Sequence, residues 1–124
     1  MRVKTNELTG AALDWTVAKC EDLACEAFNG NVFLKPEHAV RSGNAMRIWR
    51  PSMNWAQGGP IIDREKISIW DASGVGHDFS WGAHITINCN HRNHARGDTP
   101  LIAAMRCYVA SKLGDEVDVP EALL

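Results

Sequence analysis

Apolar residues recur at helical spacing near the start of the chain. From Thr9 to Glu21 they fall every three or four positions, and Thr9 has the side chain of a good N-cap. This pattern predicts an amphipathic helix with Trp15 as a core residue. The predicted buried face carries Leu8, Ala12, Trp15 and Ala18, broadened by Leu13, Val17 and Cys20.

The clearest strand pattern runs from Trp81 to Cys89. Apolar and polar residues alternate there, which buries one face of a strand and leaves the other polar. An antiparallel sheet with one wetted or ligand-lined face follows from this alternation. The Gly74-Val75-Gly76 segment before it lacks the following helix and third glycine of a phosphate loop, so it is predicted to be an ordinary connection. Shorter strands are predicted at Val32–Leu34, Ala45–Trp49, Ile61–Ile62 and Ile67–Trp70.

A second helix is predicted near the end of the chain. Asp98 or Thr99 caps it, Pro100 takes its first position, and Gly114 ends it. Its pattern of large apolar residues predicts one stripe that faces the core. That stripe consists of Ile102, Met105, Val109 and Leu113.

Another face of the second helix places one arginine, Arg106, among small residues. Such a guanidinium is free to bind phosphate or carboxylate through two hydrogen bonds. Alternatively, the alanines pack on another helix or a second subunit while Arg106 pairs with Asp14 or Glu116. The residue types alone leave both alternatives open. This face carries Thr99, Ala103, Arg106 and Ala110.

The segment from Pro51 to Ile62 fits neither a helix nor a strand pattern and is predicted to be a loop. It keeps a tryptophan beside paired glycines, so the loop either docks firmly on the domain or holds a ligand against its backbone. We expect Trp55 and Arg106 to face one cleft. The predicted ligand-binding residues are Asn54, Trp55, Gln57, Gly58, Gly59, Pro60, Thr99 and Arg106.

Composition and order of elements favour a single α+β domain over residues 1–124. The chain is 45% hydrophobic and 23% charged, typical of a soluble domain with one core. We expect an antiparallel sheet of about four to five strands, with the N- and C-terminal helices packed on one face. The formal net charge is −2, which lacks the basic footprint of a protein that binds nucleic acid or an anionic membrane. No apolar run approaches the length of a membrane span, and the N-terminus lacks the apolar segment of a signal peptide.

Cysteines and histidines offer a possible metal site. Cys89, His91 and His94 form a C-x-H-x-x-H cluster, with His84 on the preceding strand. A closed zinc site needs four ligands and a supporting turn, whereas Asn88–His94 is predicted to be a polar surface loop. We therefore expect no metal, and expect reduced, mostly buried thiols rather than disulfides. The cysteines are Cys20, Cys25, Cys89 and Cys107.

Three motifs of this sequence resemble those of the NinX-like family of tailed-phage accessory proteins, and they occur in the same order as in that family. The resemblance implies a protein that is encoded by a phage or prophage and acts in the cytoplasm of the bacterial host. It supplies no catalytic residues. The motifs are the segments Asn6–Trp15, Asn54–Ile62 and Thr99–Val109.

The favoured function is a non-catalytic binder that sequesters a nucleotide-type small molecule in order to counter a host defence, with no cofactor. An aromatic face can stack on a planar ring, and glycine amides with an arginine near a helix start can hold a phosphate. The small-residue face of the last helix and the five tryptophans also favour a homo-oligomer.

Two other classes of function remain open. An interaction protein would use exposed Trp49, Trp55 or Trp70 as anchors for a host or phage protein. A nucleotide-processing enzyme would need acid–base groups, but no nucleophile with an adjacent base is visible. The candidate acid–base groups are His77, Asp78, His84, Asp63 and Glu65.

Overall fold

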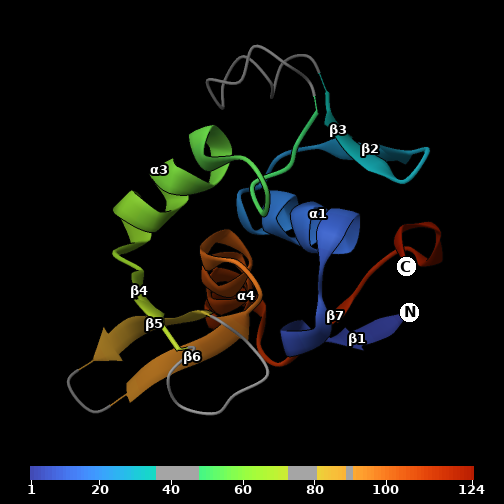
Figure 1. The fold of residues 1–124 in the computed structure, drawn as a ribbon. Helices are drawn as coiled ribbons and strands as arrows, with labels where there is room; N and C mark the ends of the chain where they lie inside the picture. Colours follow the sequence, from blue (N-terminus) through green and yellow to red (C-terminus); the bar gives the residue numbers. More distant parts are fainter. Residues whose placement is uncertain (36–47, 73–80, 89–90) are drawn as a thin grey trace.

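The computed structural model describes residues 1–35, 48–72, 81–88 and 91–124. It has an α+β fold, as predicted, with α-helices α1 (Gly10–Cys20), α3 (Trp55–Glu65) and α4 (Pro100–Leu113) (Figure 1). All described strand pairs are antiparallel. The strands are β1 (Arg2–Lys4), β2 (Cys25–Phe28), β3 (Asn31–Leu34), β4 (Ser68–Asp71), β5 (Trp81–Asn88), β6 (His91–Gly97) and β7 (Glu116–Asp118), with 3-10 helices η1 (Thr5–Glu7) and η3 (Glu121–Leu123).

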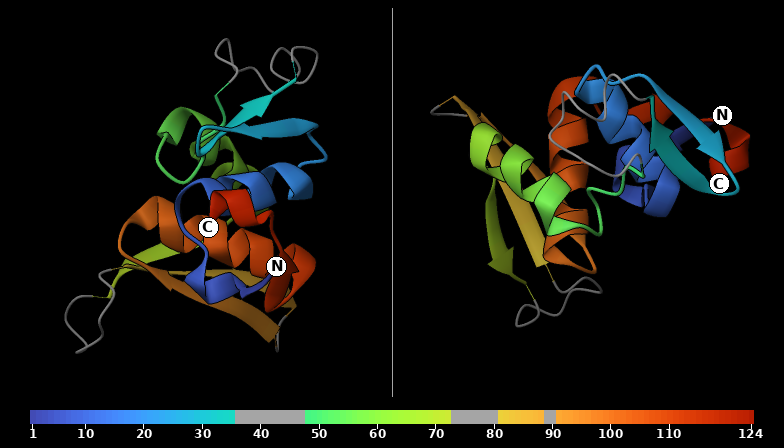
Figure 2. Two further views of the ribbon diagram at one scale, coloured as in Figure 1. Left: turned by 90° about the vertical axis from the view of Figure 1, so that its right-hand side faces the viewer. Right: turned by 90° about the horizontal axis from the view of Figure 1, so that it is seen from above.

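The strands form three small sheets instead of the one sheet expected. Their orders are β1-β7, β2-β3 and β4-β5-β6. Helix α4 packs on one face of the three-stranded sheet, α1 packs on α4, and the β2-β3 hairpin lies beyond α1 (Figures 1 and 2). The two terminal helices therefore do not share a face of one sheet, because α4 lies between α1 and the sheet.

Helix α4 is buried on nearly every side, which explains why one apolar stripe does not describe it. Leu101 and every residue from 103 to 109 are buried, whereas Leu113 of the predicted stripe is exposed. The helix starts and ends where the sequence predicts: the Thr99 hydroxyl accepts a hydrogen bond from Ile102 N (3.1 Å), and Gly114 follows with φ +88°. Because the sheet covers one side of α4 and α1 covers the other, apolar or small residues are needed on both sides of this helix.

The predictions of a loop around Trp55 and of a strand at Ile61–Ile62 are wrong, because both segments lie in α3. Asn54 starts this helix, because its Oδ1 accepts a hydrogen bond from Ala56 N (2.9 Å). Pro60 removes one backbone donor inside the helix, but both Pro60 and Ala56, whose carbonyl loses that donor, are exposed. Water can then bind the carbonyl, so the proline is tolerated.

The predicted surface loop at Asn88–His94 is also wrong in its second half, because His91 begins strand β6. Ala95 and Gly97 turn toward α4, and a Cβ at Gly97 would lie 2.6 Å from Ala103 N. Only small residues fit beneath so close a helix. The inner face of β6 therefore lacks the large apolar residues by which a strand is recognised in a sequence.

The remaining predicted elements agree with the structure where it describes them. Helix α1, the segment Val32–Leu34 within β3, and strand β5 are confirmed, while β4 starts one residue later than predicted. Ile48 makes an isolated bridge with Phe33. Residues 45–47 and the Gly74–Gly76 connection lie outside the described residues. Among the described helices, none has the length and apolar character needed to cross a membrane.

Candidate functional site

The starts of the three α-helices that the structure describes meet at one cavity of about 350 Å³. We call this cavity the helix-start groove. Two predicted ligand-binding residues, Trp55 and Thr99, come together there. The groove is lined by Thr9, Gly10, Ser52, Met53, Trp55, Thr99, Pro100, Leu101 and Ile102.

Two large side chains on the α3 side of the groove are unusually exposed. Met53 is 70% exposed and Trp55 is 53% exposed. Trp55 is the first residue of α3, so the cap at Asn54 fixes where its side chain leaves the backbone. An exposed indole offers a flat face to a ligand or a partner protein.

The α1 side of the groove offers open backbone. Of the three α-helices that the structure describes, α1 alone has no side-chain cap, since Thr9 makes no capping hydrogen bond. Gly10 has φ +57°, and nothing lies within 4 Å of the position that a Cβ would take. The first-turn N–H groups of a helix have no partner within the helix and carry its positive dipole end. An anion in the groove could approach them.

A buried carboxylate ties α1 to the turn that carries Met53. Asp14 Oδ1 accepts a hydrogen bond from Ser52 N (2.9 Å), and both residues are buried. Burial raises the pKa of Asp14 to about 6, while hydrogen bonds from Ser52 and the charge of Arg50 act in the opposite direction. Asp14 therefore positions one wall of the groove.

The other predicted residues of α3 mostly hold the helix in place. Gln57 is buried: its Oε1 accepts from Arg50 N (2.6 Å) and its Nε2 donates to Ile48 O (2.8 Å). A Cβ at Gly58 would lie 2.5 Å from Pro51 O, so this glycine allows close packing. None of the residues Asn54, Gln57, Gly58, Gly59 and Pro60 lines the helix-start groove.

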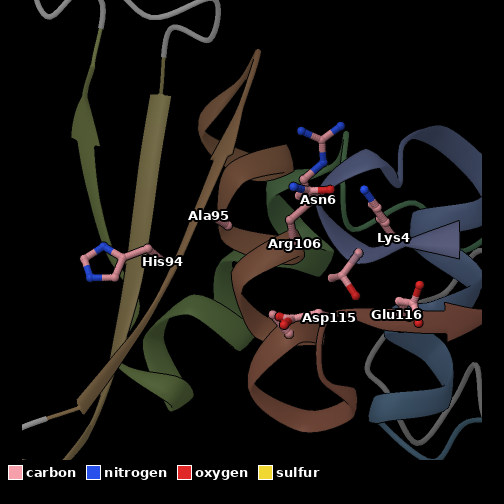
Figure 3. Close-up of a pocket in the computed structure, with 9 residues that line it drawn as sticks. Lys4, Asn6, His94, Ala95, Arg106, Asp115 and Glu116 are labelled. Carbon is pink, nitrogen blue, oxygen red and sulfur yellow. The ribbon is translucent and has the colours of Figure 1, made fainter.

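Arg106 lines a different cavity, so the prediction that it shares a cleft with Trp55 is wrong. That cavity, of about 600 Å³, lies between β6 and the paired ends of the chain (Figure 3). Its charged lining is mixed, because Lys4, Asp115 and Glu116 lie together on the side of the paired chain ends. Such a lining favours no one sign of ligand charge.

The guanidinium of Arg106 serves the fold. Arg106 is 7% exposed; its Nε donates to Leu8 O (2.7 Å) and its Nη1 donates to Arg96 O (2.9 Å). Burial lowers the pKa of Arg106, and the charge of Asp98 opposes that effect. The two hydrogen bonds to backbone carbonyls thus tie α4 to the segment before α1 and to β6.

The candidate acid–base groups do not assemble at the groove. Glu65 forms ion pairs with Arg64 and Lys112, and His84 packs against Trp70. Asp63 is exposed on α3, and His77 and Asp78 lie outside the described residues. None of the described groups lines the helix-start groove.

No metal-binding group of three or more ligands occurs within residues 1–35, 48–72, 81–88 and 91–124. Cys89 and the side chain of His91 lie outside the described part of the chain. Cys20, Cys25 and Cys107 are free thiols, and Cys107 is buried. Burial raises the pKa of Cys107 to about 12, so this thiol is unreactive.

Comparison with known families identifies the family of the chain. The family model described as bacteriophage P22 NinX matches residues 4–112. The chain belongs to the phage P22 NinX family. The match includes the motifs that contain Thr9, Trp55 and Thr99, so this NinX-family protein builds its helix-start groove from matched segments.

A solved structure shares the fold of this NinX-family protein. It is described as the "2.0 A Crystal Structure of a Phage Protein from Bacillus cereus ATCC 14579", with a TM-score of 0.58 and 11% sequence identity. The similarity covers 88% of this chain and 97% of that chain. Among curated proteins, no match to this chain is found.

Gly10 and Met53 are among the groove residues that the sequence did not predict to bind a ligand. Gly10 follows a predicted N-cap, where a glycine with positive φ leaves the backbone open, and this signal was present in the sequence. Met53 carries no such signal, because an isolated apolar residue in a polar segment is ordinary on a protein surface.

Proposed function

We propose that this phage protein binds a nucleotide-type small molecule in the helix-start groove and holds it without turning it over. The observation that carries the proposal is the meeting of three helix N-termini at a cavity with an exposed indole. Neither feature alone would suffice. Together they offer a stacking surface and an anion site within one small volume.

The two halves of a nucleotide match the two sides of the groove. A base can stack on Trp55, and such stacking contributes on the order of 1–3 kcal/mol per base. A phosphate can accept hydrogen bonds from the first turn of α1, where no side-chain cap competes with it. The cavity volume of about 350 Å³ falls at the low end of small-molecule sites.

The lining of the groove supports binding over turnover. Among the described residues that line it, none carries a titratable side chain. General acid–base catalysis requires such a group within hydrogen-bond reach of the reacting atoms. Sequestering a nucleotide signal in the host cytoplasm would let a phage protein counter a defence that uses this signal, a role inferred by analogy with other small phage proteins.

A second candidate function is docking to a host or phage protein. Met53 and Trp55 are both exposed beside the groove, and exposed aromatic residues are frequent anchors at protein interfaces. Of the other predicted anchors, Trp49 is buried and Trp70 is half-buried. This alternative therefore rests on the same surface as the nucleotide proposal, and one experiment separates them.

A thermal-shift screen against nucleotides and cyclic dinucleotides tests the proposal. Binding to the folded state is expected to raise Tm with ligand concentration. The ligand is then released by heat denaturation and analysed by mass spectrometry, and we expect it to be intact. A chemically changed ligand would indicate an enzyme. No shift with any nucleotide would contradict the proposal and favour the protein-docking alternative.

Two exposed aromatic residues give a matched pair of variants. Trp55→Ala is expected to weaken binding about tenfold or more, because the stacking surface is lost. Phe28→Ala is the control, since Phe28 is 65% exposed on β2 and does not line the groove. Equal losses in both variants, or none in Trp55→Ala, would show that the ligand binds elsewhere.

We also propose that the protein forms a homo-oligomer, but on different grounds from those in the sequence. Ala103 and Arg106 of the small-residue face of α4 are buried within the chain, so that face is not free to form an interface. Exposed Phe28, Met53 and Trp55 now support association. Light scattering is expected to give more than the monomer mass, and a clean monomer at high concentration would contradict this.

A further inference from the structure

The outer face of the three-stranded sheet carries a cluster of aromatic and basic residues. Ala83 and Ala95 are buried on the inner face, and the alternation along β5 and β6 puts His84 and His94 on the opposite one. In Figure 3 the imidazole of His94 extends over the sheet, whereas Ala95 lies on the side of α4. The register sets two rows across this face: Trp70–Gly82–Arg96 and Ser68–His84–His94.

Three rings of this face contact one another. The ring centroids of Trp70 and His84 are 5.4 Å apart, those of His84 and His94 are 5.7 Å apart, and those of Trp70 and His94 are 6.2 Å apart. Trp70 lies over Gly82, where a Cβ would come within 2.5 Å of the indole. The glycine therefore lets the half-exposed indole lie close against the sheet.

Among its described side chains this face carries one permanent cation, Arg96, although the chain as a whole is slightly acidic. Arg96 Cζ lies 5.5 Å from the centre of the Trp70 ring, and the Arg96 Nη1 atom is buried and has no hydrogen-bond partner among the described residues. None of the described side chains that face outward on the three strands is acidic. Those residues are Ser68, Trp70, His84, Thr86, His94 and Arg96, with Gly82 between them.

We propose that this outer face is a stacking platform for a single-stranded polynucleotide. Unpaired bases expose flat faces that stack on aromatic rings, and this stacking tolerates any base sequence. Trp70 and His94 supply the rings, and Arg96 supplies a charged donor for a backbone phosphate. The base faces of a duplex are stacked inside it, so a duplex could bind this face only through the charge of Arg96.

The proposed platform is separate from the helix-start groove. It also revises the expectation, drawn from the net charge, that the protein does not bind nucleic acid. A net charge of −2 excludes a basic surface over the whole molecule, but it does not exclude one basic face on a small sheet. Glu7 lines a neighbouring cavity together with His94 and Arg96, so an acidic side chain lies next to this face. Stacking and phosphate contacts do not read the sugar, so we expect DNA and RNA strands to bind alike.

Fluorescence anisotropy tests the platform with labelled single strands of DNA and RNA about 12 nucleotides long, at about 50 mM salt. The wild type is expected to bind both strands and to bind the matching duplex more weakly. Trp70→Leu and His94→Ala are each expected to weaken binding about fivefold or more. Arg96→Gln is expected to weaken binding and to reduce its dependence on salt concentration.

Controls separate this platform from the groove and from loss of folding. Trp55→Ala is expected to bind the single strands like the wild type, although it loses the small nucleotide. His94 is exposed, so His94→Ala keeps the test valid if Trp70→Leu unfolds, and circular dichroism checks both variants. Failure of the wild type to bind single strands, equal binding of the duplex, or unchanged binding by His94→Ala and Arg96→Gln would overturn the proposal.

Discussion

At the scale of single residues, Arg106 shows how a residue that looks free in the sequence can anchor the fold. Its guanidinium donates to carbonyl oxygens of Leu8 and Arg96, which lie before α1 and in β6. Arg106→Ala is expected to lower the free energy of unfolding by about 2–4 kcal/mol, because two carbonyls lose their donor. Urea denaturation measures this loss.

A second arginine is the control for that measurement. Arg2 is exposed on β1, and its ion pairs with Glu116 (3.7 Å) and Asp118 (3.8 Å) are open to water. Arg2→Ala is expected to change stability by less than about 1 kcal/mol. If Arg106→Ala is as mild as Arg2→Ala, the anchoring role assigned to Arg106 is wrong.

Asp14 makes stability depend on pH in a direction unusual for a carboxylate. Its pKa is raised to about 6 from an ordinary value of 3.8, so the folded state holds the proton more tightly than the unfolded state does. Stability from this group is therefore greatest when it is protonated, and it falls as the pH rises from about 4 to about 6. The Asp14→Asn variant has no such titration, while its Oδ1 can still accept from Ser52 N.

The two chains should therefore diverge with pH. Between about pH 4.5 and pH 7.5, Asp14→Asn is expected to gain on the order of 2 kcal/mol in unfolding free energy relative to the wild type. Other carboxylates, such as Glu65, titrate in both chains and cancel in the difference. Urea melts over this pH range provide the comparison, and parallel stability curves would refute the role of Asp14.

At the scale of elements, two adjacent glycines of α3 are expected to behave oppositely. A Cβ at Gly58 would meet Pro51 O at 2.5 Å and Leu101 Cδ2 at 2.7 Å, so Gly58→Ala is expected to cost about 1–3 kcal/mol. A Cβ at Gly59 would meet nothing within 4 Å, so Gly59→Ala is expected to stabilise the helix by up to about 1 kcal/mol. Thermal melts of the pair measure the packing of α3, and a harmless Gly58→Ala would contradict it.

Helices and strands with one buried face could be predicted from the sequence. Those whose close packing requires glycine or other small residues could not. Strand β5 alternates because α4 covers one face only, and the caps of α4 at Thr99 and Gly114 are local signals. Helix α3 was missed because glycine and proline residues are typical of loops. The need for a glycine at position 58 becomes clear only from the structure, where Pro51 lies close to it. Strand β6 was missed because the nearby α4 restricts its inner face to small residues.

At the scale of the whole molecule, the order of the layers could not be predicted because it depends on contacts distant in sequence. Pairing of β1 with β7 joins the two ends, with Val3 opposite Val117. The helix-start groove likewise needs three segments that lie far apart along the chain. The sequence marked Trp55 and Thr99 as site residues, but only the tertiary structure separates them from Arg106.

An amide NMR titration shows whether a nucleotide binds where the three described helices begin. The probe is whichever nucleotide raises Tm in the thermal-shift screen, added stepwise to labelled protein. We expect the amide signals of Gly10 and Leu101 and the indole N–H signal of Trp55 to move together with a single Kd. Binding in the groove would be contradicted if these signals stayed fixed while those of Lys4 and Asn6, or of the outer sheet face at His94, moved instead.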